Sequence, residues 1–235
     1  MKKKATLVIL NYNEIEGIKA LHDKLPLNEI DEVFAIDPGS TDGSLELLKS
    51  KGIRVIIQEV RGRGEAFRIG IKEAKNDNVV FFGPDGNEDP KDILKLVGCL
   101  ERGYDMAIAS RFMKGARADD SGIPFPIRGI GNKVFTVIAN ILWSGHLTDS
   151  INGFRAIKKD KFKHLNPDAQ GFGIEYQMSI RALKSKFKIK EFPTYEGDRI
   201  GGKSTAHTLA TGWLFLKIIL KELKMGKNFK KGENF

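Results

Sequence analysis

Apolar strand patterns and helical patterns alternate regularly through the first half of this 235-residue chain. The apolar, β-rich runs occupy residues 5–10, 32–36, 54–58, 78–82 and 106–110. The helical patterns between them occupy residues 14–24, 44–51, 64–74 and 90–102. This alternation predicts an α/β fold with a mostly parallel, doubly wound sheet and flanking helices. In such a sheet the carboxyl ends of the strands meet at one edge, where ligands bind.

Length and composition favour one domain with a C-terminal extension. The hydrophobic fraction of 41% supports a sizeable core. We find no linker, repeat or low-complexity tract, and we predict one domain over residues 1–208 and a basic amphipathic helix and tail over 209–235. Cys99 is the single cysteine, which excludes an intramolecular disulfide and agrees with a reducing, cytoplasmic compartment.

The C-terminal segment is basic, and the whole chain has a formal net charge of +9. Apolar residues recur there at helical spacing: Leu209, Trp213, Leu216, Leu220 and Leu223. With lysines beside this stripe, the pattern is typical of a helix lying in a membrane interface. A last helix that packs on the domain with a solvated lysine face would show the same pattern. Lys217 interrupts the apolar run well short of the roughly 20 residues that a membrane span needs, so we predict a peripheral segment.

Polar motifs follow three of the predicted strands. They are Asn11-Tyr12-Asn13-Glu14, the segment from Asp37 to Ser44, and the turn that contains Asp85, Glu88 and Asp89. Carboxylates gathered at one sheet edge could hold a divalent cation on a diphosphate, because Mg²⁺ and Mn²⁺ prefer oxygen ligands. Each motif is also compatible with an ordinary turn, and residues 40–44 with a helix N-cap. Asp37 shows no capping role and is the better candidate for a contact with a base or ribose.

The glycine-rich segment Arg61-Gly62-Arg63-Gly64 could hold a phosphate at a helix start. The full dinucleotide fingerprint does not follow the first strand, which disfavours hydride transfer. The four histidines lack metal-ligand spacing, which disfavours a zinc site. The basic stretch carries no base-reading motif, so we expect no nucleic-acid partner.

Taken in order, these motifs resemble family 2 glycosyltransferases, in particular the polyprenyl-phosphate sugar synthases such as dolichol-phosphate mannose synthase. The likeness continues through Gly153-Phe154-Arg155 and Arg199-Ile200-Gly201-Gly202-Lys203-Ser204, and it covers roughly residues 5 to 205. The resemblance implies a GT-A fold and a GDP- or UDP-linked sugar donor. It also implies a divalent cation, Mg²⁺ or Mn²⁺, and an inverting transfer of one hexose to a lipid monophosphate.

The resemblance also assigns residues to roles. The implied catalytic residues are Asp85, Arg111, Arg128, Asp149 and Arg199. The implied substrate-binding residues are Asn11, Tyr12, Asn13, Glu14, Asp37, Gly39, Ser40, Asp42, Gly64, Arg155 and Lys203. Gly83 replaces the first Asp of the family's D-x-D motif, which leaves Asp85 with Glu88 or Asp89 as its helper and makes metal dependence an open question. We name Asp85 and Glu88 as the metal ligands. Glu175 matches an acid behind the site.

A hexosyltransferase for polyprenyl (dolichyl) phosphate, peripheral on the cytoplasmic membrane face, is therefore the expected function. The apolar helix over residues 131–143 would then lie against the membrane, or would be a core helix; a membrane-anchoring partner subunit would also fit. One alternative is a family 2 enzyme with a hydroxyl (glycan) acceptor and Asp149 as general base. Another is a catalytically silent nucleotide-sugar-binding protein, which the incomplete D-x-D motif suggests.

Overall fold

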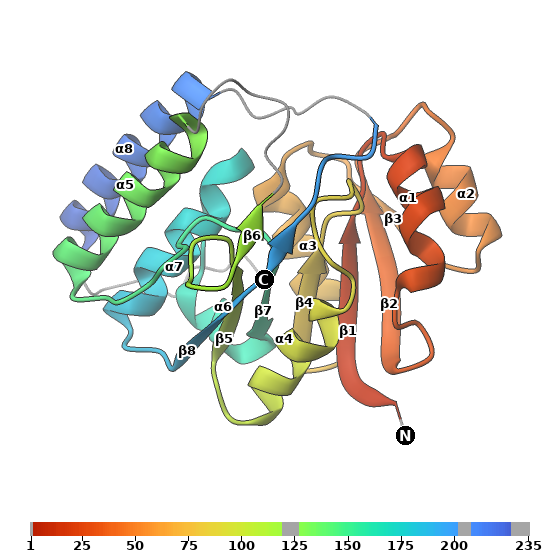
Figure 1. The fold of residues 1–235 in the computed structure, drawn as a ribbon, viewed down its shortest axis with the longest axis horizontal. Coiled ribbons are helices and arrows are strands. Elements are labelled where there is room, and N and C mark those ends of the chain that lie inside the picture. Colours follow the sequence, from red (N-terminus) through yellow and green to blue (C-terminus); the bar gives the residue numbers. More distant parts are fainter. Residues whose placement is uncertain (1, 119–126, 202–207, 227–235) are drawn as a thin grey trace.

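The computed structural model describes residues 2–118, 127–201 and 208–226, without the side chains at 118, 127, 128, 208 and 209. A seven-stranded sheet with the order β3-β2-β1-β4-β7-β5-β8 forms its centre (Figure 1). Its strands are β1 (Lys3–Leu10), β2 (Ile30–Asp37), β3 (Arg54–Ile57), β4 (Asn78–Phe82), β5 (Met106–Ser110), β7 (Arg155–Lys158) and β8 (Ile189–Pro193). A two-stranded ladder joins β6 (Arg117–Ala118) to β9 (Tyr195–Glu196).

The predicted mostly parallel sheet is confirmed, and all five predicted strands are present. Strands β1, β2, β3 and β4 pair in parallel, as do β5 and β8. The sequence pattern did not indicate β7, which is antiparallel to both β4 and β5 and separates them. Because β7 runs in the opposite direction, the segment that precedes it lies at the same edge as the carboxyl ends of β4 and β5.

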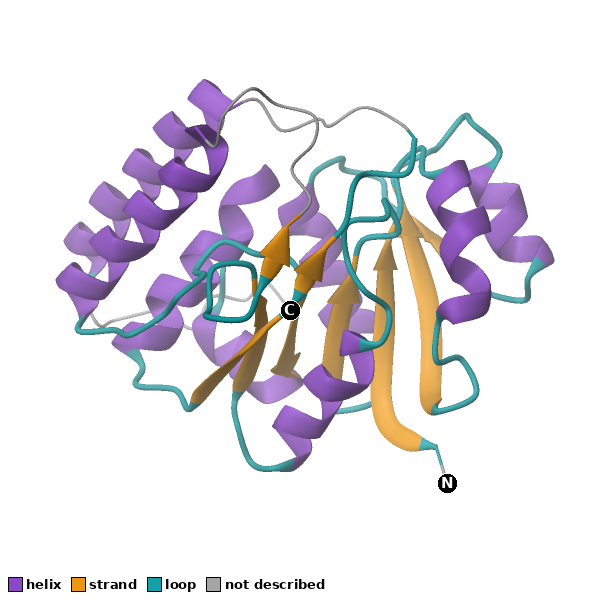
Figure 2. Cartoon of the chain, in the orientation of Figure 1, coloured by secondary structure: helices purple, strands orange, loops and turns teal. Residues whose placement is uncertain are grey.

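Helices cover both faces of the sheet (Figure 2). They are α1 (Ile15–Leu21), α2 (Ser44–Ser50), α3 (Arg63–Glu73), α4 (Asp92–Glu101), α5 (Ile127–Trp143), α6 (Lys159–Leu165), α7 (Ile174–Lys184) and α8 (Thr208–Met225), with short 3₁₀ turns η1 (His22–Lys24) and η2 (Gly171–Gly173). The central strands are buried on both sides: Leu7 and Phe82 pack with α1 and α4, whereas Val8 and Phe81 pack with α3 and α7. Burial on both faces explains why these strands read as continuous apolar runs.

A third apolar cluster joins α5, α7 and α8 through side chains that include Tyr176, Phe215 and Ile218. Phe135 of α5 packs edge-on against both Tyr176 and Phe215, with ring centroids 5.9 and 5.1 Å apart. Figure 1 shows α5 and α8 side by side at one end of the molecule. Helix α8 is therefore packed onto the rest of the chain, as the second interpretation of the C-terminal segment expects, but it packs through Phe215, Ile218 and Ile219, whereas the described part of the predicted stripe faces outward.

The outer face of the same helix pair is apolar. On α5 the exposed side chains include Val134, Val137 and Ile141, and on α8 they are Trp213, Leu216, Leu220 and Leu223. Trp213 is 62% exposed and Ile141 is 74% exposed. Among the residues that the structure describes, no helix is long and apolar enough to cross a membrane. We call these seven exposed residues the α5–α8 face. The two helices therefore pack on the domain through their inner sides and expose this apolar face to solvent.

Candidate active site

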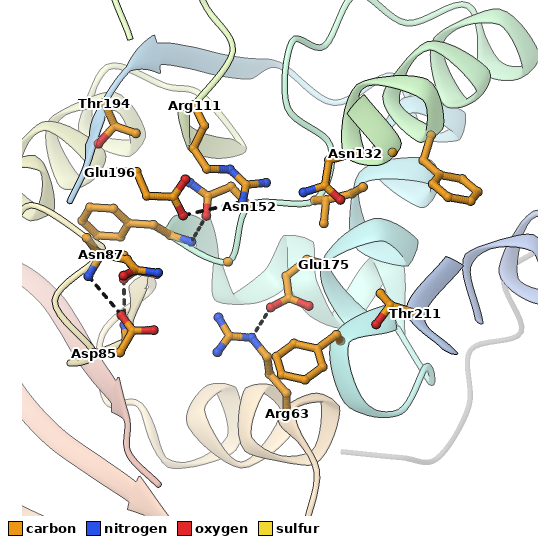
Figure 3. Close-up of a pocket in the computed structure, with 18 of the residues that line it drawn as sticks. Arg63, Asp85, Asn87, Arg111, Asn132, Asn152, Glu175, Thr194, Glu196 and Thr211 are labelled. Atoms are coloured by element: carbon orange, nitrogen blue, oxygen red, sulfur yellow. Dashed lines mark hydrogen bonds and ion pairs between the residues drawn. The ribbon is translucent and has the colours of Figure 1, made fainter. Parts of the chain in front are cut away.

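A cavity of about 200 Å³ is lined by the Asp85 turn, by the Gly153 motif and by residues of α5, α7 and α8 (Figure 3). One end is polar, with Arg63, Asp85, Asn87, Glu88, Arg111, Asn152, Glu175 and Glu196 among its lining residues. The other end is built largely from α5, η2 and α8, with Phe135, Phe172 and Phe215 beside Gly131, Thr211 and Gly212. The cavity can therefore receive a ligand that carries charge at one end and apolar groups at the other.

Asp37 ends β2 and is fully buried. Its Oδ1 accepts hydrogen bonds from the backbone N–H groups of Gly39 and Ser40 at 2.7 and 2.6 Å. Its Oδ2 accepts from Asn11 Nδ2 at 2.5 Å and from Ser40 Oγ at 2.7 Å. The expectation that Asp37 has no capping role was wrong, because an aspartate commonly bonds its own backbone two residues on. Its contact with a base or ribose stays a prediction.

The motif around Asn11 is tied to the same turn. Ser40 Oγ accepts the backbone N–H of Asn13 at 2.9 Å, and Asn13 Oδ1 accepts the backbone N–H of Thr41 at 2.8 Å. Asn13 has a φ of 54°, a left-handed conformation that asparagine tolerates better than most residues. The first two polar motifs therefore form one hydrogen-bonded unit, as their positions at a shared sheet edge predicted.

Asp42 caps two helices at once. Its Oδ2 accepts the backbone N–H of Ile15, the first residue of α1, and its Oδ1 accepts that of Ser44, the first residue of α2, both at 2.9 Å. The predicted turn and helix start within residues 40–44 are thus present, with Gly43 as the N-cap residue and Asp42, just before it, as the side-chain acceptor. Tyr12 is 37% exposed, and the guanidinium of Arg61 lies 5.6 Å from its ring centroid. Tyr12 therefore presents an aromatic surface beside this unit.

Arg199 joins two of the predicted acidic residues. Its Nη1 donates to Asp85 Oδ2 at 2.8 Å, and its Nη2 donates to Glu14 Oε1. Burial raises the pKa of Glu14 to about 7; the positive charge of Arg199 opposes this shift and the negative charge of Asp85 adds to it. The second oxygen of Glu14 is buried and has no hydrogen-bond partner among the described residues. These three residues come from segments far apart in the sequence.

The backbone around Asp85 is closely packed. A Cβ atom at Gly17 of α1 would lie 1.8 Å from the carbonyl oxygen of Pro84, so only glycine permits this approach. On the other side, the backbone N–H of Ile200 donates to the carbonyl oxygen of Asp85 at 2.7 Å. The position of Asp85 is therefore set from two sides by α1 and by the segment that carries Arg199.

Glu88 lies beside the place where the first D-x-D carboxylate would be. Its Oε2 accepts the backbone N–H of Gly83 at 2.7 Å. A Cβ atom at Gly83 would lie 3.6 Å from Glu88 Oε1 and 3.9 Å from Asp85 Oδ1. Burial raises the pKa of Glu88 well above its ordinary value, and the negative charge of Asp85 raises it further.

Two neighbouring carboxylates fit Mg²⁺ or Mn²⁺, because such ions often take one or two carboxylates and complete their shell with phosphate and water. No group of three or more His, Cys, Asp or Glu side chains suited to a metal occurs in residues 2–118, 127–201 and 208–226. A cation here would thus depend on ligand oxygens for most of its shell. The assignment of Asp85 and Glu88 as metal ligands stays a prediction.

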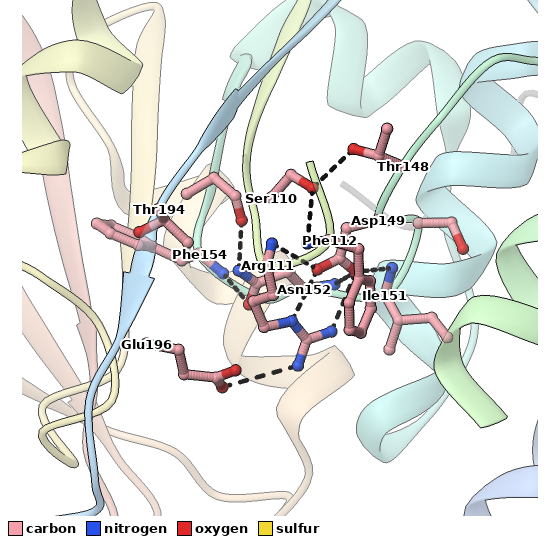
Figure 4. A network of polar contacts seen from close by, with 12 residues as sticks. Ser110, Arg111, Phe112, Thr148, Asp149, Ile151, Asn152, Phe154, Thr194 and Glu196 are labelled. Atoms are coloured by element: carbon pink, nitrogen blue, oxygen red, sulfur yellow. Dashed lines mark hydrogen bonds and ion pairs between the residues drawn. The ribbon is translucent and has the colours of Figure 1, made fainter. Parts of the chain in front are cut away.

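Arg111 and Asp149 form a buried, two-armed ion pair (Figure 4). Arg111 Nε donates to Asp149 Oδ2 at 2.7 Å and Nη2 donates to Oδ1 at 3.0 Å. Oδ1 also accepts the backbone N–H groups of Ile151 and Asn152 at 3.2 and 3.0 Å. Burial alone would raise the pKa of Asp149, but the charge and hydrogen bonds of Arg111 outweigh burial and lower it. Asp149 is therefore an ionised carboxylate whose two oxygens are both engaged.

Arg155 is fully buried and does not line the cavity. Its guanidinium donates to the carbonyl oxygens of Asn152 and Glu175 at 2.8 and 2.9 Å and to Ser179 Oγ at 3.2 Å. Burial lowers its pKa to about 10. The structure thus gives Arg155 a positioning role, holding residues 150–152 against α7, in place of the predicted contact with substrate.

Gly64 serves close packing at the start of α3. A Cβ atom there would lie 2.2 Å from the carbonyl oxygen of Ala169. Phosphate binding by residues 61–64 stays a prediction. Lys203 lies outside the described residues, and Arg128 lies in α5 with its side chain outside the description.

The cavity contains residues that motif patterns did not single out as ligand contacts. Arg63 donates from Nε to Glu175 Oε1, and Glu175 Oε2 is buried without a partner in the described part of the chain. A Cβ atom at Gly153 would lie 2.0 Å from Arg63 Nη2, so this glycine makes room for the arginine. Asn152 and Glu196 line the cavity as well. Their only sequence signal was proximity to glycine-rich motifs.

The family assignment comes from comparison with known proteins. A family model described as Glycosyl transferase family 2 matches residues 6–165. The chain belongs to this family. The resemblance found in the motifs is thereby confirmed, and the predicted GT-A fold is confirmed by the sheet and by solved structures of the same fold.

The chain is similar to two curated glycosyltransferases and to one solved structure. The chain is 29% identical over 196 residues to Glycosyltransferase AglJ of Haloferax volcanii, covering 83% of this chain and 63% of the relative's length. It is 26% identical over 226 residues to the Dolichyl-phosphate hexose transferase of the same organism, covering 92% and 94%. Glucosyl-3-phosphoglycerate synthase of Mycobacterium tuberculosis, solved with Mn²⁺ and UDP-glucose, superposes with a TM-score of 0.70 at 21% identity, covering 98% and 81%.

Proposed function

We propose that this family 2 glycosyltransferase moves a hexose from a GDP- or UDP-linked donor onto a polyprenyl (dolichyl) phosphate, as a peripheral enzyme on the cytoplasmic membrane face. The observation that carries the proposal is the two-ended cavity, whose charged end continues into an aromatic end between α5 and α8. A lipid phosphate has this same division between a charged head and an apolar tail. The dolichyl-phosphate hexose transferase among the relatives supports the choice of acceptor.

The donor would bind across residues 11–14, 37–44 and 83–88, of which the last range lines the polar end of the cavity. Asn11, Tyr12, Asn13, Gly39, Ser40 and Asp42 form or adjoin the hydrogen-bonded unit that would face the nucleoside, with Asp37 fixing its turn. Asp85 and Glu88 would hold Mg²⁺ or Mn²⁺, which when bound neutralises the diphosphate leaving group. The structural neighbour that contains Mn²⁺ and UDP-glucose supports such use of a cation. Arg199, Lys203 and Gly64 would contact the diphosphate.

The acceptor phosphate would bind Arg111, with Arg128 as its second cationic contact. A planar guanidinium grips phosphate oxygens with two parallel hydrogen bonds. Asp149 holds Arg111 in one orientation through Nε and Nη2, which leaves Nη1 directed toward Glu196 at 3.8 Å. A phosphate is already anionic, so the reaction needs in-line positioning more than proton removal. Asp149 is thus a positioning residue, because both its oxygens are occupied.

The membrane surface would bind the α5–α8 face. Its exposed apolar side chains include Trp213 and Leu220, and Lys217 and Lys221 flank them on the same helix. Aromatic and aliphatic side chains enter the headgroup region while neighbouring lysines meet anionic lipid. The cavity reaches the first turns of both helices, through Gly131 and Gly212. An acceptor tail could therefore pass from the membrane directly to the phosphate site, with or without an anchoring subunit.

A hydroxyl acceptor is the second candidate, and one observation favours it. Glu175 Oε2 is a buried carboxylate oxygen at the cavity wall with no partner among the described residues, so it could accept a proton from a sugar hydroxyl. Asp149, the base first considered for this reaction, has both oxygens engaged. A silent nucleotide-sugar-binding protein is a third reading, which rests on Gly83 in the D-x-D motif alone.

The test is transfer of label from radioactive GDP- and UDP-sugars into organic-extractable lipid, with purified protein, polyprenyl phosphate, and either Mn²⁺ or EDTA. We expect label in the organic phase with one donor and with Mn²⁺ only. The matched pair Glu175→Gln and Arg111→Lys separates the acceptors. If the acceptor is a lipid phosphate, Arg111→Lys should lose more transfer activity than Glu175→Gln. If the acceptor is a hydroxyl group, Glu175→Gln should lose more transfer activity. Nucleotide binding without any transfer would support the silent binder.

A further inference from the structure

The guanidinium of Arg199 is bound to the same carboxylate that would hold a divalent cation. Its Nη1 lies 2.8 Å from Asp85 Oδ2, while the other oxygen of Asp85 accepts the backbone N–H of Asn87 at 3.2 Å. The side chains of Arg199 and Asp85 are about one quarter exposed, at 25% and 24%. The Asp85 side chain is therefore partly accessible to solvent, and its Oδ2 is already shared with a positive charge.

A second carboxylate holds the other arm of this arginine. Arg199 Nη2 donates to Glu14 Oε1, and the side chain of Glu14 is only 9% exposed. Glu14 is the residue immediately before α1, so this second carboxylate comes from a different segment than Asp85. Its other oxygen is buried without a partner among the described residues, so nothing described there draws it away from Arg199.

The backbone of the arginine's segment is fixed, so only the side chain can move easily. The backbone N–H of Ile200 donates to the carbonyl oxygen of Asp85 at 2.7 Å, and that of Gly197 donates to the carbonyl oxygen of Asn87 at 3.0 Å. A Cβ atom at Gly86 would lie 2.5 Å from Ile200 Cγ1. Residues 197–200 thus pack directly on the Asp85 turn.

We propose that Arg199 and the divalent cation are alternative partners of Asp85 Oδ2, and that Glu14 is a positioning residue that keeps Arg199 beside the site while they exchange. The inference rests on the proposed function, since it takes the cation and the sugar-nucleotide diphosphate as ligands. The physical reason is charge: a guanidinium and a divalent cation repel strongly when they share one carboxylate oxygen. Once the cation holds Asp85, the released arm of Arg199 faces the diphosphate, its natural partner.

The exchange predicts effects of opposite sign on two ligands. Arg199→Gln removes a competitor of the cation. In the absence of nucleotide, this variant should therefore bind Mn²⁺ about 5-fold more tightly than the natural protein, which corresponds to a modest coupling free energy. The same variant should bind UDP or GDP more weakly when Mn²⁺ is saturating, because a diphosphate contact is lost. Arg199→Lys retains the charge and should stay near the natural protein with Mn²⁺ alone. A merely structural role would shift both ligands in one direction.

The experiment is titration of the full-length protein with Mn²⁺ alone, followed by electron paramagnetic resonance of the free ion, and then with UDP or GDP at saturating Mn²⁺. Arg54→Gln is the matched charge control, because Arg54 pairs with Glu73 and Glu32 at the β3 edge instead of with Asp85. It should leave Mn²⁺ affinity unchanged. Circular dichroism and urea unfolding confirm that each variant is folded.

Three outcomes would overturn the exchange. Arg199→Gln could bind Mn²⁺ no more tightly than the natural protein, none of the proteins could bind Mn²⁺, or Arg199→Gln and Arg199→Lys could change Mn²⁺ affinity equally. For Glu14, a double-mutant cycle with Glu14→Gln and Arg199→Gln should show non-additive losses in nucleotide binding; additive losses would remove Glu14 from the proposal. These readouts need no sugar transfer. Failure of transfer to lipid with an intact exchange would therefore reject the acceptor and leave the exchange standing.

Discussion

Two regions of the candidate active site are held together by different forces. The β2 side, defined by residues 11–14 and 37–44, relies on turn hydrogen bonds such as those from Gly39 and Ser40 to Asp37. The β7 side, defined by residues 111, 149–155 and 175, relies on buried charge. Arg111 and Asp149 are 38 residues apart in the chain, and Arg63 and Glu175, whose ion pair borders it, are 112 residues apart.

The difference teaches what kind of substitution each side tolerates. A turn hydrogen bond joins a side chain to backbone groups close to it in the chain, and water can replace it where the turn is exposed; the buried Asp37 is the exception on this side. A buried ion pair has no such substitute, because removing one partner leaves the other charge without compensation in a region of low dielectric. We therefore expect the β7 side to be the more sensitive one, and the following measurements test this from the largest effect to the smallest.

Asp149→Ala should lower the free energy of unfolding by about 3–5 kcal/mol, because it leaves the buried guanidinium of Arg111 without its carboxylate. Urea unfolding measures this loss. Asp160→Ala is the control, since Asp160 has a side chain that is 70% exposed and should change stability by less than about 0.5 kcal/mol. Similar losses in the two variants would remove the distinction between the sides.

Gly17→Ala tests whether α1, the helix that follows residues 11–14 of the β2 side, has a contact that turn chemistry does not explain. The added methyl would meet the Pro84 carbonyl oxygen at 1.8 Å, so α1 or the Asp85 turn must shift, at a cost of about 3 kcal/mol. Gly131→Ala is the matched control, because a Cβ atom there meets no atom within 4 Å. Chemical unfolding of both variants compares them; unchanged stability in Gly17→Ala would contradict the packing at Asp85.

Glu14 gives the β2 side its own pH dependence. Its pKa of about 7 in the folded protein exceeds the ordinary value of 4.5, so the folded state binds the proton more tightly than the unfolded state does. The stabilisation is complete below pH 4.5 and is lost as the pH rises through 7. Between pH 5 and 8 we expect the natural protein to lose about 2 kcal/mol relative to Glu14→Gln. If the free energy of unfolding, measured with urea, changed equally with pH in the natural protein and in Glu14→Gln, this prediction would be contradicted.

Trp213→Ser should have the smallest effect on stability, less than about 0.5 kcal/mol, because the side chain is 62% exposed on the α5–α8 face. It should nevertheless reduce sedimentation with vesicles that contain anionic lipid, since an aromatic anchor is lost. Phe215→Ser is the contrasting variant, because Phe215 is buried and should unfold more easily. Unchanged vesicle binding by folded Trp213→Ser would count against the membrane proposal.

Local patterns predicted the five strands of the first half and the sheet edge at which the polar motifs lie. The continuous apolar runs at β1 and β4 and the turn at residues 40–44 follow from burial and from short-range hydrogen bonding, which the sequence displays directly. Arg155 was misjudged, because its place in a family motif suggested ligand contact whereas its burial is a tertiary property. Arg63 and Glu175 were not recognised as a pair, since nothing in either segment indicates the other.

The sequence by itself determined the alternation of strands and helices, the edge where the polar motifs gather, and the family to which the chain belongs. The tertiary structure alone decided that β7 runs antiparallel between β4 and β5, and that Arg199 lies between Glu14 and Asp85. The physical reason is the separation along the chain over which each kind of interaction acts. Periodicity and turn chemistry act between residues a few positions apart, whereas ion pairs and close packing depend on where distant segments meet in space.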